Sequence, residues 1–380
     1  MNSKSSIFVS TILAVAMSCV GISHFGYQPQ VEKGVESDSV ASEASKAQQS
    51  TKFEVLGGPR KPILGLRVKE VDSIGLTVHD MDAELKFFTE VLPFNIVSDE
   101  EIVGEDFEEL FGVFGCRVRV VRLQLGNEFI SLNQFLAPRG RPIPVDSKSN
   151  DGWFQHIAIV VSNMEEAYAH LRKHNVEHAS TGPQTLPDWN PNAGGIKAFY
   201  FKDPEGHVLE IIWFPDGKGN PKWQGQKDLF LGIDHTAIAV SDTEKALRFY
   251  RDFLGMTVAG ESENYGPEQE RLNNVFGARL RITGLKAESG PGIELLEYLA
   301  PSNGLPYPVS TSMNDLWSWR TRLVVESSDA VVRAAKSSSV DFVSPGSVEI
   351  VDDEIGIDRG VTLAGPFGHR MILVEEPAND

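Results

Sequence analysis

The sequence has very few cysteines. Cys19 and Cys116 are the only two in 380 residues, so a disulfide framework is excluded. Basic residues are also scarce: 35 Lys and Arg stand against 53 Asp and Glu, which gives a formal net charge of -18. Because nucleic-acid binding needs clustered Lys and Arg against phosphates, this balance argues against a nucleic-acid partner. The hydrophobic fraction of 41% is ordinary for a folded protein, and the length allows about two to three domains.

A long apolar run lies near the N-terminus, from Ile7 to Ile22, and follows Lys4. This pattern is typical of a secretory signal. The run is slightly short for a spanning helix, and an uncleaved anchor is the second interpretation. We therefore expect residues 1–26 to be a signal peptide or an N-terminal membrane anchor. The protein would then be exported to the periplasm or the extracellular space, either free or tethered to a membrane.

Residues 27–65 are rich in Ser, Glu, Gln, Ala and Lys, and they carry too little apolar surface to order themselves. We interpret this segment as a disordered tether between the N-terminal run and the folded part of the chain.

From residue 66 onward the sequence repeats with a period of about 160 residues, as expected for a duplicated domain. Residues 113–119 are matched by 275–281, and Asn150–Trp153 by Asn314–Trp317. We expect a first domain at 66–226 and a second at 227–377.

Each half divides again, because every quarter opens with an alternating strand followed by an amphipathic helix. Residues suited to N-cap these helices are Asp80, Asn163, Asp242 and Ser327. The sequence thus predicts four units of one strand, one helix and several further strands. Their boundaries are 66–145, 150–216, 230–310 and 315–377.

Two motifs connect these units to a known family: His235-Thr-Ala-Ile-Ala-Val240, and Asp203-Pro-Glu-Gly-His-Val-Leu-Glu210. With the fourfold pattern over residues 66–377, they resemble the vicinal oxygen chelate superfamily. That superfamily includes glyoxalase I, methylmalonyl-CoA epimerase, extradiol dioxygenases and bleomycin-resistance proteins. The resemblance implies an α+β fold in which four βαβββ modules pair into two half-open, cup-shaped sheets. It also implies metal ligands on the first and last strand of a unit.

The ligand positions of the family, carried over unit by unit, hold one His and one Glu in each of the two central units. These residues are His156 and Glu210 in the second unit and His235 and Glu294 in the third. The same positions hold Ser73 and Ser131 in the first unit and Arg320 and Ile372 in the fourth.

Strand alternation supports this assignment, since successive residues face opposite sides of a sheet. His156 shares its face with Ala158, and His235 shares its face with Ala237, which leaves room beside each imidazole. Two imidazoles and two carboxylates suit a divalent transition metal, and zinc, nickel, cobalt, manganese and iron all remain open. Taken singly, each residue also fits a structural role, as a core His or a Glu paired across a sheet.

The pairing of units decides whether one complete site forms. If neighbours pair in chain order, each cup receives one His and one Glu, which makes a weak site. If the second unit pairs with the third and the first with the fourth, all four side chains converge. We expect this crossed pairing, because it explains why the ligand residues occur in the two central units.

The resemblance implies a metal that binds two adjacent oxygens of a small-molecule substrate and stabilises a developing anion. We expect Glu210 or Glu294 to act as the base in glyoxalase-like or epimerase-like proton transfer. A ring-cleaving dioxygenase is a second interpretation, and a metal-free binding protein of the bleomycin-resistance kind is a third. The sequence leaves open whether the protein is a monomer or a homodimer.

Three further features have competing interpretations. We expect Arg320 to pair with an acidic neighbour and not to take the place of a cation. The loop from Thr185 to Gly195 is either a lid over the inner cup or an ordered surface loop. Arg279 and Arg281 recur as Arg117 and Arg119, which favours a structural role over substrate binding.

Overall fold

The computed structural model describes residues 66–350 and 355–377. The predicted signal or anchor and the predicted tether lie outside these described residues. Among the described helices, none combines the length and the apolar character that a membrane span requires.

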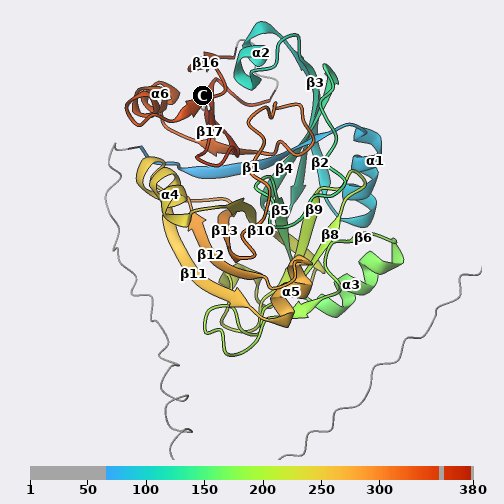
Figure 1. The fold of residues 1–380 in the computed structure, drawn as a ribbon. Coiled ribbons are helices and arrows are strands. Elements are labelled where there is room, and N and C mark those ends of the chain that lie inside the picture. The colour runs from blue at the N-terminus through green and yellow to red at the C-terminus, as the bar shows by residue number, and fades with distance from the viewer. Residues whose placement is uncertain (1–65, 351–354, 378–380) are drawn as a thin grey trace, which may run out of the picture. The chain divides into compact units, whose positions relative to one another are not determined.

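The first two units follow the predicted order of a strand, a helix and further strands (Figure 1). The first unit comprises β1 (Glu70–Val78), α1 (Met81–Lys86), η1 (Phe87–Val91), β2 (Asn95–Val103), α2 (Glu105–Phe111), β3 (Arg117–Leu125) and β4 (Glu128–Ala137). The second comprises β5 (Gln155–Val161), α3 (Met164–Lys173), β6 (Glu177–His178), β7 (Gln184–Thr185), β8 (Lys197–Lys202), β9 (Val208–Trp213) and η2 (Pro221–Trp223).

The last two units repeat this order. The third comprises β10 (Phe230–Val240), α4 (Thr243–Leu247), η3 (Arg248–Phe253), β11 (Thr257–Tyr265), α5 (Pro267–Asn273), β12 (Arg279–Lys286) and β13 (Gly292–Ala300). The fourth comprises β14 (Arg320–Val324), α6 (Ser328–Ser337), β15 (Asp341–Phe342), β16 (Val348–Glu349), β17 (Arg359–Ala364) and β18 (Arg370–Glu375).

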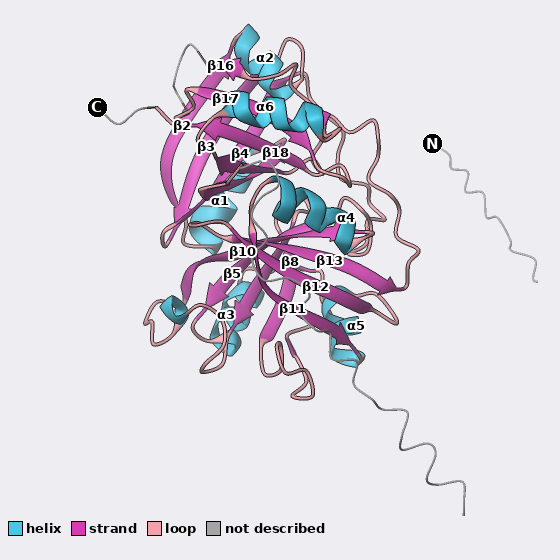
Figure 2. Ribbon diagram, turned by 90° about the vertical axis from the view of Figure 1, so that its left-hand side faces the viewer, coloured by secondary structure: helices cyan, strands magenta, loops and turns pink. Residues whose placement is uncertain are grey.

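The strands form two nine-stranded sheets, shown as two layers of magenta arrows in Figure 2. The outer sheet has the order β15-β17-β18-β14-β1-β4-β3-β2, with β16 on β17, and holds units one and four. The inner sheet has the order β11-β12-β13-β10-β5-β9-β8-β6, with β7 on β8, and holds units two and three. The fold is therefore α+β, with four βαβββ units paired into two half-open sheets. We call their concave sides the outer cup and the inner cup.

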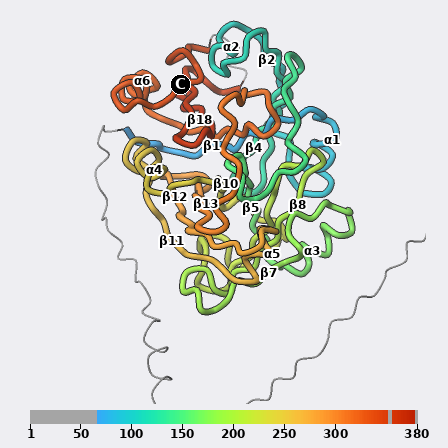
Figure 3. Tube along the Cα trace, viewed as in Figure 1, coloured from blue at the N-terminus to red at the C-terminus, as the bar shows by residue number. Residues whose placement is uncertain are grey.

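The crossed pairing is the one that the structure contains. β1 runs antiparallel to β14, from Glu70 opposite Val324 to Gly75 opposite Arg320. β10 pairs antiparallel with β5 in the inner sheet. Figure 3 shows the red C-terminal unit returning to the blue β1. Each half of the chain, 66–226 and 227–377, thus contributes one unit to each sheet.

Side-chain caps start the four long helical segments. Asp80, Asn163, Asp242 and Ser327 each accept a hydrogen bond from a backbone N–H one turn into the helix. These are the N-caps that the sequence predicts. In the first and third units the α-helix continues as a π-helix, η1 and η3, so the hydrogen-bonding pattern changes along the helical segment.

The repeated Asn-Asp motifs, at residues 150–151 and 314–315, connect the two halves of the chain by hydrogen bonds. Asn314 Nδ2 donates to the carbonyl oxygen of Pro138 at 2.9 Å, just beyond β4. In the other half, the Leu305 N–H donates to Asp151 Oδ1 at 2.8 Å, just beyond β13. Each motif therefore fixes the chain that leaves the opposite half, which explains why the motif occurs twice.

Apolar clusters cover both sides of each sheet. The outer cup is filled under α2 by side chains such as Phe107, Val118 and Ile372. Cys116 lies buried in this cluster as a core residue, and burial raises the pKa of its thiol to about 11. The inner cup is partly filled under α5, where Leu272 joins the cluster that contains Ala237. The polar side chains of each cup are thus surrounded by apolar ones.

Candidate metal centre

Four neighbouring strands bring the predicted residues to the concave face of the inner sheet. His156 lies on β5 directly opposite Ala237 of β10, and Glu294 of β13 is the other neighbour of Ala237. Glu210 of β9 lies beside Ala158, which is opposite His235. This register places all four side chains on one face, as strand alternation predicts.

The four side chains meet at short distances. Glu210 Oε2 lies 3.1 Å from His156 Nε2 and 3.7 Å from His235 Nε2. Glu294 Oε2 lies 3.5 Å from His235 Nε2. One ligand atom each from His156, Glu210 and His235 falls within 4.8 Å of the others, so these groups could hold a metal ion. The two imidazole rings are 5.6 Å apart between centroids.

The burial of these groups fits a bound cation. His156 is fully buried and Glu210 is 4% exposed, whereas the Glu294 side chain is 25% exposed. Within the described residues, neither ring nitrogen of His156 nor Nε2 of His235 has a hydrogen-bond partner. A buried polar atom without a partner is costly, and a metal would satisfy one nitrogen of each imidazole together with both carboxylates.

Asp234 orients one of the two imidazoles. Its Oδ2 lies 3.0 Å from His235 Nδ1, and its Oδ1 accepts from the Trp223 indole at 2.9 Å. Burial alone lowers the pKa of His235, but Glu294, Asp234 and Glu210 outweigh burial and raise it to about 9. The ring would then be held by Asp234 on one nitrogen while the other points to the cluster, and a carboxylate bound to the far nitrogen of an imidazole in this way orients it as a metal ligand. Asp234 is not among the residues predicted from the sequence, although its place next to His235 could have indicated it.

The equivalent positions in the outer sheet carry no ligand set. Ser73 and Ser131 flank Gly75 on β1 and β4, and Ile372 takes the place of Glu210. Among the described residues Arg320 has no acidic partner, contrary to the prediction. Its Nη2 donates to the Thr77 hydroxyl and to the Met313 carbonyl, and its guanidinium lies 5.6 and 5.9 Å from the Phe135 and Phe111 ring centroids.

A second buried acidic group lies between the first two units. Glu84, Asp203 and His207 are also close enough together to hold an ion. However, His207 Nδ1 lies 2.7 Å from Asp203 Oδ2 and its Nε2 lies 3.0 Å from the Leu316 carbonyl oxygen. Both ring nitrogens are therefore engaged, and this group connects α1 to the β8–β9 turn.

The loop after β7 bridges the two edges of the curled inner sheet. Asn190 Nδ2 donates to Asn264 Oδ1 at 2.7 Å, and the Trp189 ring packs on Tyr265 at 4.4 Å between centroids. β7 pairs with β8 near one edge of the sheet, and β11 forms the other edge. The loop is therefore an ordered segment that connects the two edges.

The repeated arginines have structural partners. Arg281 pairs with Glu244 and Glu261, and Arg119 pairs in the same way with Asp82 and Asp99. These ion pairs agree with the structural role that the repetition favours.

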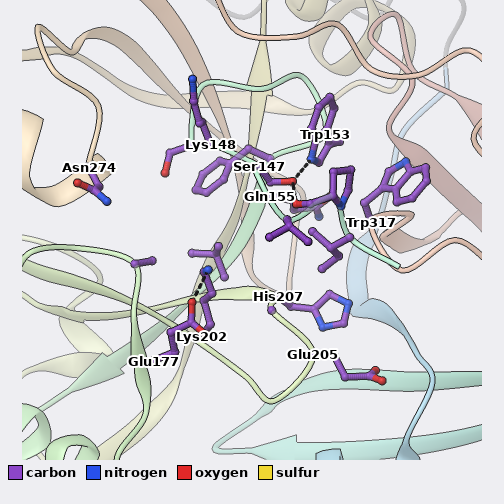
Figure 4. A pocket seen from close by; sticks show the side chains of 18 of the residues that line it. Ser147, Lys148, Trp153, Gln155, Glu177, Lys202, Glu205, His207, Asn274 and Trp317 are labelled. Atoms are coloured by element: carbon purple, nitrogen blue, oxygen red, sulfur yellow. Dashed lines mark hydrogen bonds and ion pairs between the residues drawn. The ribbon is translucent and has the colours of Figure 1, made fainter. Parts of the chain in front are cut away.

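A separate cavity of about 460 Å³ opens beside the β8–β9 turn (Figure 4). Figure 4 shows His207 and Glu205 at one end of it, and Lys202 bound to Glu177 on its wall. Of the four clustered residues none lines this cavity. Phe154 lines it and lies 5.7 Å from the His156 ring, so one aromatic side chain separates the cavity from the cluster.

Comparisons with known proteins agree with this architecture. Residues 70–211 and 232–342 match the profile of the family described as the Glyoxalase/Bleomycin resistance protein/Dioxygenase superfamily. A 2-epi-5-epi-valiolone epimerase from an Actinomyces species is 30% identical over 154 residues, which is 39% of this chain and 80% of that protein. A lactoylglutathione lyase from Schizosaccharomyces pombe is 26% identical over 196 residues, which is 50% of this chain and 60% of that protein.

Solved structures show the same fold. The crystal structure of glyoxalase I from Zea mays has a TM-score of 0.54 at 15% identity, and covers 81% of this chain and 92% of its own. A putative dioxygenase from Bacillus subtilis has a TM-score of 0.50 at 14% identity, and covers 83% of this chain and 87% of its own.

Proposed function

The chain belongs to the Glyoxalase/Bleomycin resistance protein/Dioxygenase superfamily, and from that premise we propose that it is a metal-dependent enzyme of glyoxalase-like or epimerase-like type. Its substrate would be a small molecule with two adjacent oxygens. The observation that supports this proposal most directly is the convergence of two imidazoles and two carboxylates in the inner cup. The similarity to a lyase and to an epimerase points to the same class of chemistry.

The donor set would hold a divalent transition ion, with His156, His235, Glu210 and Glu294 as ligands. Such an ion, when bound, supplies Lewis-acid stabilisation of negative charge on a substrate oxygen. One buried nitrogen of each imidazole without a partner fits this role, since the lone pair of a ring nitrogen can bind the ion. Zinc, nickel, cobalt, manganese and iron are all compatible with this set.

The two carboxylates would have different tasks. Glu210 is the more buried and lies near both imidazoles, so it serves as the fixed ligand. Glu294 is the most exposed of the four, and burial raises its pKa together with the nearby Glu210 charge, against the opposing effect of His235. A carboxylate with a raised pKa that reaches solvent is suited to accept a proton at Oε2 from the carbon next to a carbonyl.

The apolar surroundings would limit water at this step. Tyr200 and Phe154 pack against the His156 ring, at 4.8 and 5.7 Å between centroids. An apolar surface that excludes water on that side strengthens electrostatic contacts between the cluster and a substrate. Substrate would then approach from the side of Glu294.

Metal content and proton exchange test this proposal together. We expect one equivalent of a divalent transition metal in wild type, and exchange of the proton next to a carbonyl with solvent deuterium in a small α-hydroxycarbonyl compound. Glu294→Gln should retain metal while lowering exchange by about 10²- to 10⁴-fold. The matched control is Glu297→Gln, three residues along β13, whose carboxylate caps the helix at Thr243.

Two outcomes would contradict the proposal. Oxygen consumption with a catechol, without proton exchange, would favour a ring-cleaving dioxygenase. Stoichiometric binding of small ligands without any metal, unchanged in His156→Ala, would favour a metal-free binding protein.

A further inference from the structure

The outer cup contains a buried positive charge at the position that a metal ligand occupies in the inner cup. Arg320 lies opposite Gly75 in the β1–β14 pair, as His156 lies opposite Ala237 in the β10–β5 pair. The two sheets therefore place a guanidinium and an imidazole at equivalent points of their concave faces.

Arg320 lacks a counter-ion among the described residues. It is 3% exposed, and its Nε and Nη1 have no hydrogen-bond partner there. Its Nη2 donates to the Thr77 hydroxyl and to the Met313 carbonyl. The guanidinium also lies 5.6 and 5.9 Å from the Phe135 and Phe111 ring centroids, which are weak partners compared with a carboxylate. Burial lowers its pKa to about 9, the direction expected for a buried cation without a counter-ion among the described residues.

Of the two acidic residues on the described wall of the cup, one is paired with arginines and the other is exposed. Asp72 Oδ1 lies 2.6 Å from Arg122 Nη2, and Asp72 Oδ2 lies 3.3 Å from Arg322 Nε. Glu376, the other acid on the described wall, is exposed at the rim. The wall thus carries three arginines against two acids, in a chain whose net charge is -18.

The cup has room and polar groups beside Arg320. A cavity of about 630 Å³ is lined by Arg320, Ser131 and Asn133. Ser131 Oγ accepts from Asn133 Nδ2 at 3.1 Å, which leaves its hydroxyl hydrogen for another acceptor. A Cβ at Gly75 would lie 2.6 Å from Arg320 Cγ, so the glycine is what lets this side chain cross the strand. The Glu210 position holds Ile372, which adds no negative charge.

We propose that the outer cup is a second binding site, which takes a small molecule through a carboxylate or phosphate group held by the Arg320 guanidinium. An oxyanion would supply acceptors for the free nitrogens and neutralise the buried charge, and charge-assisted hydrogen bonds of this kind are the strong ones. The site is independent of the metal centre, since it lies on the other sheet.

Calorimetric titration of the full chain with inorganic phosphate, acetate and uncharged acetamide tests this proposal. We expect one phosphate or acetate per chain and no binding of acetamide; whichever of the two anions binds more tightly identifies the head group. Arg320→Met should weaken anion binding by about tenfold or more. Arg117→Met, an exposed arginine paired with Glu101, should bind as wild type does.

Two further variants separate this site from the metal centre and from misfolding. His156→Ala should keep the anion affinity of wild type, whereas its loss would place the anion at the metal centre and overturn the proposal. Ile372→Glu keeps Arg320 and adds a carboxylate to the cup, so it should also weaken anion binding by about tenfold or more. Equal anion binding by wild type and both outer-cup variants, or none by wild type, would refute the site.

Discussion

In the inner cup, Ala237 separates His156 from Glu294, and a small side chain leaves space for an ion. In the outer cup, Gly75 lies between Arg320 and Ser131, and the still smaller residue leaves space for a long cationic side chain. The backbone register is the same, yet one face gathers groups that attract cations and the other a group that attracts anions. The fold thus fixes where a ligand can sit, and a few side chains decide the sign of its charge.

A second pair of equivalent positions shows the same principle. Between units one and two, buried Glu84 meets the Asp203–His207 turn. Between units three and four, Ala246 takes the place of Glu84, and the matching turn holds Gly365 and Phe367. There Lys245 lies 5.1 Å from the Phe367 ring centroid instead. A polar contact in one half is therefore replaced by a cation–π contact in the other.

The largest contrast should come from truncating equivalent residues of the two cups. We expect Glu210→Ala to abolish stoichiometric metal binding, because it removes the carboxylate shared by both imidazoles. Ile372→Ala should leave metal content unchanged and lower the free energy of unfolding by about 2–5 kcal/mol, through the cavity it leaves. Metal analysis and urea denaturation measure both. Retained metal in Glu210→Ala would remove the distinction between the cups.

The aspartates that precede the two first-strand positions should also differ. Asp234→Asn should lower metal affinity by about 10- to 100-fold, because Asp234 orients His235. Asp72→Asn should leave metal affinity unchanged and cost about 3–5 kcal/mol of stability, since it leaves Arg122 and Arg322 without their carboxylate. Competition with a metal indicator and chemical denaturation distinguish them. Equal metal affinities in the two variants would contradict the assigned roles.

The buried acid between units one and two should make stability depend on pH. Burial and the neighbouring Asp203 and Glu205 charges raise the pKa of Glu84 well above its ordinary value of 4.5. The folded state therefore retains a proton that the unfolded state releases, and stability falls as pH rises above about 4.5. His207, whose pKa is raised by Asp203 against the effect of burial, acts in the same direction, since its contribution is lost as pH rises above about 6.5.

Removing this carboxylate should flatten the pH profile. We expect Glu84→Gln to reduce the loss of stability between about pH 6 and pH 9, by up to about 1.4 kcal/mol per pH unit. Glu90→Gln, on the exposed face of η1, is the matched control and should keep the wild-type profile. Thermal unfolding at several pH values measures the effect. A Glu84→Gln profile as steep as wild type would show that the acid is ionised in the folded protein.

The smallest effect on stability is expected at positions where the two halves carry the same residue with the same kind of ion pair. Arg281 and Arg119 occupy matching positions and pair with two acids each. Each Arg→Met substitution should cost less than about 1 kcal/mol, because partly exposed ion pairs contribute little. Proton exchange should also stay at the wild-type rate in both. A large loss of that activity in Arg281→Met alone would mean that Arg281 contacts substrate.

Much of the fold could be predicted from the sequence because the same local patterns occur in each unit. The caps at Asp80, Asn163, Asp242 and Ser327 depend only on neighbouring residues, and strand alternation places His156 and His235 on one face. The crossed pairing followed from where the ligand residues occur, not from any local pattern. Periodicity shows where each unit lies along the chain, but it does not show which units pair.

The remaining features depend on contacts between distant segments. Glu84 becomes a buried acid only because the turn with Asp203 and His207, in another unit, packs over it. Arg320 has no acidic partner among the described residues, whereas Asp72 of the same cup pairs with Arg122 of β3. Neither set of contacts is visible in sequence, where every arginine has acids nearby. Asp234, by contrast, adjoins His235 and was within reach of sequence reasoning.

The antiparallel pair of β1 and β14 joins the first described strand to the last unit. During synthesis, β1 must wait for its partner until the second and third units have left the ribosome, whereas β5 and β10 belong to consecutive units. The inner sheet can therefore assemble before the outer one, whose closure carries the larger loop entropy. A chain that stops short of β14 would leave one side of β1 with unpaired backbone groups, an open edge available to other chains.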